Sequence, residues 1–295
     1  MLSRSELDRA AVLLKECPSV LVLGHQYPDG DAIGSVLALS LMLRENGQQV
    51  QASWPEPFET PEKYAFIPGG ELLVRPGNIQ PGHALTVALD CANEGRLEGL
   101  RETAVSVPLI NVDHHPDNSA FGTVNLVDAS AAATAEIVYS IAGPLGLKVT
   151  GDAALGLYTG IVTDTGRFQF SNTTARTLEV AGELIGAGVE PHLVFQNVYQ
   201  CDSLPYLRLS GEILCRAVFD KEFAMVYAFL SREDLERFGV RMNETEDLID
   251  NLRALRGHRI AALFKQLEDG TIRVSLRSRP QTDIGSVARA LGGGG

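Results

Sequence analysis

Aspartates and histidines occur in four short segments of this sequence, and together they could form a metal site. The segments are His25-Gln26-Tyr27-Pro28-Asp29-Gly30-Asp31, the single residue Asp90, Asp113-His114-His115, and the single residue Asp164. Carboxylates gathered in one place would repel one another and take up protons unless a cation neutralised them. Carboxylate and imidazole ligands without thiolate favour Mn²⁺, with Mg²⁺, Co²⁺ or Fe²⁺ as alternatives.

A pair of divalent ions at such a site indicates one kind of chemistry. Two metals about 3.5–4 Å apart can share a bridging carboxylate and a bridging hydroxide, and the hydroxide can attack phosphorus in line. The metals stabilise the charge that develops on the phosphoryl oxygens. The pattern therefore predicts hydrolysis of phosphate esters.

Each segment also has a simpler interpretation when it is taken alone. Asp29-Gly30 could form an ordinary turn, with Asp31 as the N-cap of the next helix. Asp90 could cap a loop, the segment 164–166 could be a plain turn, and the adjacent histidines could be solvated. The combination favours a metal site, because four independent turns rarely all carry ligand-type residues.

Predicted strands place three of the four segments at strand ends. Short apolar runs predict strands at residues 19–24, 85–89 and 108–112, and His25, Asp90 and Asp113 follow them directly. Helices are predicted at residues 5–15, 31–46, 134–141, 153–162 and 174–187. Alternating strands and helices indicate a parallel sheet with helices on both faces. Ligands of such sheets bind at the carboxyl ends of the strands, so the segments should meet at one rim.

The pattern changes after about residue 187, which indicates a second, smaller α+β domain. Its predicted elements are helices at 204–219 and 247–255, and strands at 223–230, 259–266 and 271–277, with a hairpin turn at Asp269-Gly270. We therefore predict a catalytic domain at 1–188, a linker at 189–205 and a second domain at 206–295. The fold class is α/β.

The net charge of −12 argues against a protein that tracks long nucleic acid, since such a protein needs a basic face. Between Arg253 and Arg289, however, eight lysines and arginines stand against three acidic residues. A local basic segment fits a small anionic substrate. Taken by itself, however, such a segment is more typical of a solvated surface.

Several other classes are excluded. No apolar run approaches the roughly 18 residues of a membrane span, and the N-terminus lacks the apolar core of a secretory signal. The four cysteines form no close pair, so we expect reduced thiols in a cytoplasmic protein. The glycines between residues 24 and 34 lack the dinucleotide-binding spacing, and no nucleophile elbow supports Ser-His-Asp catalysis.

The order H-x-x-x-D-x-D, then D, then D-H-H, then D resembles the signature of the DHH phosphoesterases over nearly the whole chain. The resemblance implies that His25, Asp29 and Asp90 hold one metal. It implies that Asp31, Asp90, His114 and Asp164 hold the other, with Asp90 bridging. Asp113 would orient the histidine pair, and His115 would face the scissile phosphate and stabilise the transition state.

The C-terminal part is similar to the DHHA1 substrate-binding domain that accompanies the DHH domain. The family pattern there is a strand ending in Arg-Ser, a short helix, and a glycine-rich loop followed by His. By resemblance, Arg277 and Ser278 would bind a substrate phosphate, and Gly292, Gly293 and Gly294 would belong to the loop. This sequence ends at Gly295, so we interpret the glycines as a truncated loop or an artificial end.

The two-domain layout is similar to the nanoRNase branch of the family, the oligoribonucleases that also dephosphorylate 3′-phosphoadenosine 5′-phosphate. The resemblance implies a Mn²⁺-dependent hydrolase of oligonucleotides of about two to five residues, acting on short RNA or DNA, with a homodimer as a further expectation. Two alternatives are a long single-strand exonuclease of the same family and a non-catalytic nucleotide-binding module. Arg277-Ser278 argues against the pyrophosphatase branch.

Overall fold

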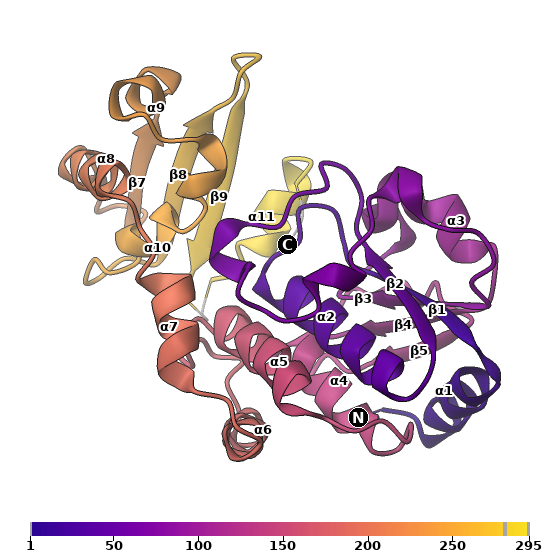
Figure 1. Ribbon diagram of the computed structural model, residues 1–295. Helices are drawn as coiled ribbons and strands as arrows, with labels where there is room; N and C mark the ends of the chain where they lie inside the picture. Colours follow the sequence, from indigo (N-terminus) through magenta and orange to yellow (C-terminus); the bar gives the residue numbers. More distant parts are fainter. Residues whose placement is uncertain (1, 280–281, 294–295) are drawn as a thin grey trace. The chain divides into compact units, whose positions relative to one another are not determined.

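Figure 1 shows the computed structural model, which describes residues 2–279 and 282–293. The chain divides into two compact units, Met1–Gln200 and Cys201–Gly295. Each unit has a sheet and a hydrophobic core of its own.

The first unit is built on a five-stranded sheet in which all strands run parallel. The strands are β1 (Ser19–Leu23), β2 (Gln49–Ser53), β3 (Leu85–Leu89), β4 (Leu109–Asp113) and β5 (Val124–Val127). Their order is β2-β1-β3-β4-β5, so the chain reverses its direction of winding between the adjacent strands β1 and β3. A crevice for ligands forms at the carboxyl ends of the strands at such a switch point.

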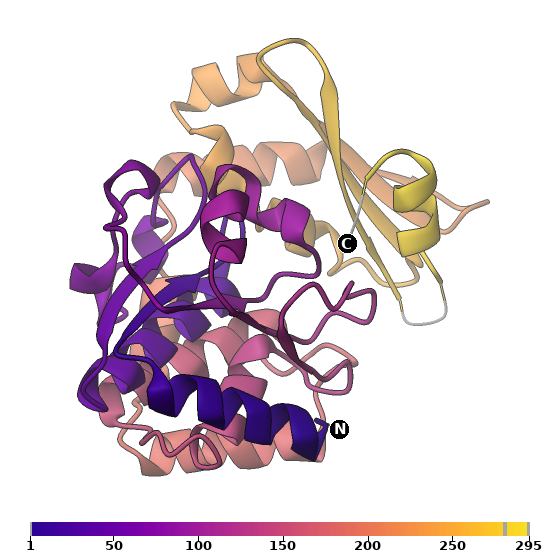
Figure 2. The ribbon, with the colours of Figure 1, turned by 90° about the vertical axis from the view of Figure 1, so that its right-hand side faces the viewer.

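Helices cover both faces of this sheet (Figures 1 and 2). The helices are α1 (Arg4–Glu16), α2 (Gly30–Glu45), α3 (Arg101–Val105), α4 (Thr134–Ala142), α5 (Gly151–Asp164), α6 (Ala175–Gly186) and α7 (Pro191–Tyr199), with short 3-10 helices η1 (Glu62–Tyr64), η2 (Gly70–Leu72), η3 (Pro76–Asn78) and η4 (Glu94–Leu100). Val20 and Val22 of β1 belong to the core that includes α2, α4 and α5. Leu21 and Leu23 point to the opposite face and pack with η4 and α3. Burial on both faces explains why β1 reads as a continuous apolar run.

Glycines bring α2 and α5 unusually close together. A Cβ on Gly34 of α2 would lie 2.3 Å from the carbonyl oxygen of Gly156 in α5, so only glycine fits there. A Cβ on Gly160 would lie 2.7 Å from a carboxylate oxygen of Asp31. This close approach brings the first turn of α2 next to the last turn of α5, which carry Asp31 and Asp164.

The second unit contains a four-stranded mixed sheet with helices packed on it. Its strands are β6 (Val218–Asp220), β7 (Met225–Leu230), β8 (Ile260–Gln266) and β9 (Ile272–Ser278), in the order β6-β7-β8-β9. Its helices are α8 (Leu204–Cys215), α9 (Arg232–Phe238), η5 (Met242–Thr245), α10 (Leu248–Leu252) and α11 (Gly285–Ala290). Val226, Ala228 and Leu263 pack with Leu209 of α8 and Leu248 of α10. The predicted fold class, a parallel-sheet domain plus a smaller α+β domain, is confirmed.

The structure differs from the sequence prediction in the segment that joins the two parts. Residues 189–205 were predicted to be a linker, but they contain α7, and Val194 and Val198 of α7 belong to the first core. Pro191 lies in the first turn of α7, where proline is favoured because that turn needs no N–H donor. The first unit therefore extends to Gln200, twelve residues beyond the predicted boundary at 188.

Some elements were predicted with other bounds or were missed. The helix predicted at 204–219 ends at Cys215, and β6 follows because Val218 and Phe219 pair with Tyr227 and Val226 of β7. The short elements β2, β5 and α9 were not predicted. Among the described residues, no helix is long and apolar enough to cross a membrane.

Candidate active site

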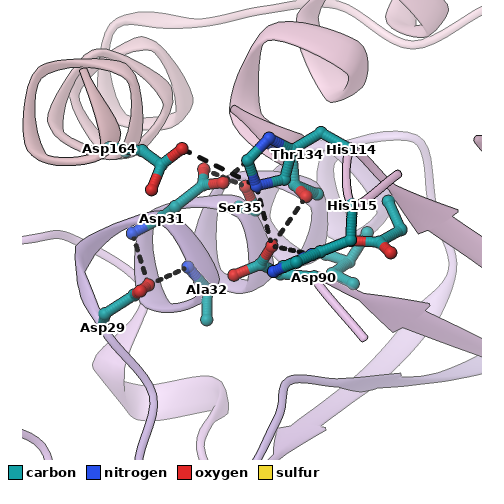
Figure 3. Close-up of polar contacts among 12 residues, drawn as sticks. Asp29, Asp31, Ala32, Ser35, Asp90, His114, His115, Thr134 and Asp164 are labelled. Atoms are coloured by element: carbon teal, nitrogen blue, oxygen red, sulfur yellow. Dashed lines mark hydrogen bonds and ion pairs between the residues drawn. The ribbon is translucent and has the colours of Figure 1, made fainter. Parts of the chain in front are cut away.

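The structure brings all four predicted segments together at the carboxyl rim of the first sheet (Figure 3). His25 follows β1, Asp90 follows β3, and Asp113 is the last residue of β4. Asp31 lies in the first turn of α2, and Asp164 ends α5. The rim is formed at the switch point between β1 and β3.

Asp90 lies at the centre of the cluster and faces two sides at once. Its Oδ2 is 3.4 Å from Nε2 of His25, whereas its Oδ1 is 3.6 Å from Nε2 of His114 and 3.7 Å from Nδ1 of His115. Its side chain is buried, and its backbone adopts a left-handed conformation with φ +59°. A non-glycine residue in that region is strained by roughly 1–3 kcal/mol, and such strain concentrates at functional sites.

Ligand-type atoms form three compact groups, each within 4.8 Å, that share residues. The groups are His25, Asp29 and Asp90; Asp90, His114 and His115; and Asp31, His114 and Asp164. Asp90 and His114 each belong to two groups. The geometry thus allows two neighbouring cations with Asp90 between them. It also groups His115 with possible metal ligands, whereas the family resemblance places His115 at the substrate.

Two aspartates of the first segment also cap helices. Oδ1 of Asp29 accepts hydrogen bonds from the backbone N–H groups of Asp31 and Ala32 at 3.0 and 3.1 Å, so Asp29 is the N-cap of α2. The simpler interpretation had assigned that cap to Asp31. Asp31 instead accepts hydrogen bonds from the backbone N–H groups of Thr134 (2.6 Å) and Ala135 (2.9 Å) at the start of α4. Each carboxylate oxygen has two lone pairs, so capping leaves capacity for a cation.

Asp113 lies under the histidine pair and is held by an asparagine. Nδ1 of His115 donates to Oδ1 of Asp113 at 2.7 Å, and Nδ2 of Asn118 donates to Oδ2 at 2.6 Å. Nδ2 of Asn118 also lies 2.8 Å from Oδ1 of Asn111 in β4. This network fixes the ring of His115. Asn118 and Thr134 were missed by sequence reasoning, because neither residue belongs to a ligand-type pattern.

The protonation behaviour of the cluster reflects its crowding. Burial raises the pKa of Asp31 well above its usual range, and the charges of Asp90, Asp164 and Asp29 raise it further. Burial also opposes the charge of Asp90, but His25, His114 and His115 outweigh it and hold the pKa of Asp90 below its ordinary value. The hydrogen bond to Asp113 raises the pKa of His115 to about 9. These carboxylates and imidazoles are therefore strongly interdependent.

The predicted substrate-binding residues lie in the second unit. Arg277 and Ser278 are consecutive in β9, so their side chains point to opposite faces of the sheet. Arg277 is exposed, and its Nη1 donates to the carbonyl of Leu276 at 3.0 Å. The Ser278 hydroxyl donates to the carbonyl of Thr282 at 2.7 Å. Gly292 (φ +81°) and Gly293 follow α11, whereas Gly294 lies outside the described residues.

Part of the predicted basic segment is structural. Lys265 is fully buried, and its Nζ donates to the carbonyl of Thr245 at 3.0 Å and lies 3.2 Å from Oε1 of Glu246. Arg253 pairs with Asp250 at 2.9 Å. These two cations support the fold of the second unit, so fewer than the eight counted in the sequence remain for an anionic ligand.

This α/β rim gathers aspartates and histidines from three strand ends, and three groups of these side chains could hold a metal ion. Residues 19–161 match the DHH family, N-terminal domain, and residues 222–295 match the DHHA1 domain. Over 276 residues the chain is 36% identical to the bifunctional oligoribonuclease and PAP phosphatase NrnA of Thermus thermophilus, covering 94% of this chain and 81% of that protein. The chain belongs to the DHH family, and its predicted class, a DHH phosphoesterase with a DHHA1 domain, is confirmed.

Solved structures show that the fold is shared. An exopolyphosphatase-related protein from Bacteroides fragilis superposes with a TM-score of 0.93 at 21% identity, covering 100% of this chain and 89% of that one. RecJ from Thermus thermophilus in complex with Mn²⁺ gives a TM-score of 0.53 at 15% identity, covering 99% of this chain and 50% of RecJ. At these identities the likeness concerns the fold alone.

Proposed function

We propose that this protein hydrolyses oligonucleotides of about two to five residues to mononucleotides, using two divalent ions, preferentially Mn²⁺. We further propose that it removes the 3′-phosphate of 3′-phosphoadenosine 5′-phosphate. The observation that carries the proposal is the position of Asp90, whose two carboxylate oxygens face His25 on one side and His114 on the other.

The donor set fits divalent cations. Asp29, Asp31, Asp90 and Asp164 supply four carboxylates within a few ångströms, and the site's own histidines lie against them. Burial, and then the neighbouring carboxylates, raise the pKa of Asp31, which is the expected behaviour of a carboxylate that lacks its counter-cation. Oxygen and imidazole ligands without thiolate suit Mn²⁺ or Mg²⁺.

Each side chain has a proposed role in the reaction. His25 and Asp29 would hold one ion, Asp31, His114 and Asp164 the other, and Asp90 both. When bound, the two ions would activate water for in-line attack on phosphorus and stabilise the charge on the phosphoryl oxygens. The ring of His115, fixed by Asp113, would donate a hydrogen bond to the scissile phosphate.

Charge supports a short substrate. With a net charge of −12, most of the protein surface repels a long polyanion, so each added phosphate beyond a local basic site weakens binding. The exposed guanidinium of Arg277 is the proposed contact for a terminal phosphate, in keeping with the resemblance of residues 222–295 to the DHHA1 domain. The relative from Thermus thermophilus is named for both activities, an oligoribonuclease and a PAP phosphatase.

The test is a side-by-side assay of a labelled diribonucleotide, its deoxy counterpart and 3′-phosphoadenosine 5′-phosphate. Each substrate is incubated with the chelated protein, then with added Mn²⁺ or Mg²⁺. We expect mononucleotides from the dinucleotides and inorganic phosphate from the bisphosphate, restored by Mn²⁺ after chelation. A protein that binds these nucleotides but turns none over with any divalent metal would be a nucleotide-binding module, and the proposal would fail.

A further inference from the structure

Thr134 contacts two of the clustered carboxylates at once. Its hydroxyl donates to Oδ1 of Asp90 at 3.0 Å, and its backbone N–H donates to Oδ2 of Asp31 at 2.6 Å. The residue is fully buried at the start of α4 (Figure 3). A buried hydroxyl that meets a buried carboxylate makes a charge-assisted bond, which is stronger than an ordinary hydrogen bond. Thr134 is therefore tied to the site through its side chain as well as its backbone.

The hydroxyl contact decides how the carboxylate of Asp90 is turned. The terminal torsion of an aspartate is broad, so without a partner the plane of the carboxylate can rotate. The bond from Thr134 holds Oδ1 on the side of His114 and His115, and Oδ2 then faces His25. An oxygen that accepts this bond keeps a second lone pair for a cation.

The backbone contact is a separate matter. The backbone N–H groups of Thr134 and Ala135 donate to the carboxylate of Asp31, and these bonds do not depend on the side chain at position 134. Substitution of Thr134 thus removes the hydroxyl from Asp90 without removing the anchor of Asp31. The two effects can be separated experimentally.

We propose that Thr134 is a positioning residue whose hydroxyl orients the carboxylate of Asp90 so that one oxygen faces each of the two metal-binding groups. The inference rests on the proposed two-metal function. It adds that Thr134, which is not itself a metal ligand, helps to determine how the metals bind. Residues that orient metal ligands influence metal affinity by about 10–100-fold. The proposal therefore concerns metal binding before it concerns turnover.

The experiment uses isothermal titration calorimetry to measure Mn²⁺ binding to the 295-residue protein after treatment with a chelator. Thr134→Val and Thr134→Ala both lack the hydroxyl, and Thr134→Ser keeps it. Thr86→Val is the matched control, because Thr86 is equally buried in β3 and its hydroxyl has no partner among the described residues. Thermal unfolding of each metal-free variant reports on the fold.

We expect the wild type, Thr134→Ser and Thr86→Val to bind two Mn²⁺ ions with similar affinity. Thr134→Val and Thr134→Ala should bind at least one ion about 10–100-fold more weakly. If Thr134→Val does not fold, Thr134→Ala carries the comparison, since alanine is a strong helix former. A lowered melting temperature alone would indicate a purely structural role for Thr134.

Three outcomes would overturn the inference. Unchanged Mn²⁺ affinity in Thr134→Ala, in a preparation whose wild type is active, would overturn it and leave the proposed function intact. Equal weakening in Thr134→Ser and Thr134→Ala would assign the effect to side-chain volume rather than to the hydroxyl. A wild-type protein that binds no divalent metal would overturn both the inference and the proposed function.

Discussion

Oδ1 of Asp113 lies 2.7 Å from Nδ1 of His115, and this contact sets the protonation state of the imidazole ring. A carboxylate can only accept, so Nδ1 carries the proton. The same contact favours the charged ring, and Asn118 holds Asp113 from its other oxygen. A doubly protonated imidazole beside the metal ligands is suited to donate a hydrogen bond to a phosphate oxygen.

Replacement of Asp113 should lower the pKa of His115. In the metal-free protein we expect that pKa to be about 9, and in Asp113→Asn to fall towards the ordinary value of 6.5, because the partner of the charged ring is lost. Histidine ring NMR over a pH series measures it. Asp117→Asn, which removes an exposed carboxylate nearby, is the control.

The same shift predicts a pH dependence of stability. A raised histidine pKa stabilises the folded metal-free protein fully below pH 6.5, and this contribution is lost as the pH rises through about 9. The unfolding free energy of Asp113→Asn should therefore differ most from that of the wild type at low pH. A pKa of His115 that is identical in both proteins would show that Asp113 does not set its protonation.

His115→Ala should keep the metal ions and lose rate. His115 is proposed to act on the transition state, so its removal should lower kcat with little change in Mn²⁺ content. Metal analysis of the purified variant, alongside steady-state kinetics, checks this. Depleted Mn²⁺ would instead support the grouping of His115 with Asp90 and His114 as a ligand.

Asp90→Asn should nearly abolish turnover while the fold stays intact. The substitution removes the charge that is shared by both proposed ions, so both should bind more weakly. Because metal-assisted activation supplies several kcal/mol, we expect less than about a tenth of wild-type activity at saturating Mn²⁺. Circular dichroism verifies the fold, and higher residual activity would contradict the bridging role.

Arg277→Ala should mainly weaken substrate binding. Loss of one charge-assisted phosphate contact costs on the order of 1.5–3 kcal/mol, which should appear in KM for a dinucleotide. Hydrolysis of a small chromogenic phosphodiester should persist. Arg273→Ala, on the same strand and face, is the control. Equal loss on both substrates would mean that Arg277 supports the fold or the metal site.

The sequence was sufficient to predict which segments meet at the rim of the first sheet. His25, Asp90 and Asp113 follow apolar strands whose burial on both faces makes them easy to recognise, and parallel pairing brings strand ends together. The sequence could not show which aspartate caps which helix. The N–H groups that donate hydrogen bonds to Asp31 belong to residues more than 100 positions away, so these bonds arise only from tertiary packing.

The residues that hold the ligand side chains in place could not be predicted from the sequence either, because their contacts also arise only from tertiary packing. Thr134 and Asn118 are ordinary helix-start and loop residues until the fold places them against Asp90 and Asp113. Lys265 shows the opposite case, a residue that the sequence analysis counted towards a basic substrate patch although it has a structural role. Its side chain is buried against Thr245 and Glu246. Composition counts charges, whereas only the packing decides which of them face solvent.

The central claim, a two-metal hydrolase of short oligonucleotides, is tested most directly by kcat/KM across a series of RNA lengths. Substrates from dinucleotides to strands of about 20 residues are compared at fixed ionic strength and Mn²⁺, since salt changes the repulsion between the acidic protein and a polyanion. We predict the highest kcat/KM at about two to five nucleotides and a steady fall beyond, as repulsion grows without new contacts. Degradation of the longest strands as efficiently as dinucleotides would contradict the claim and identify a long single-strand exonuclease.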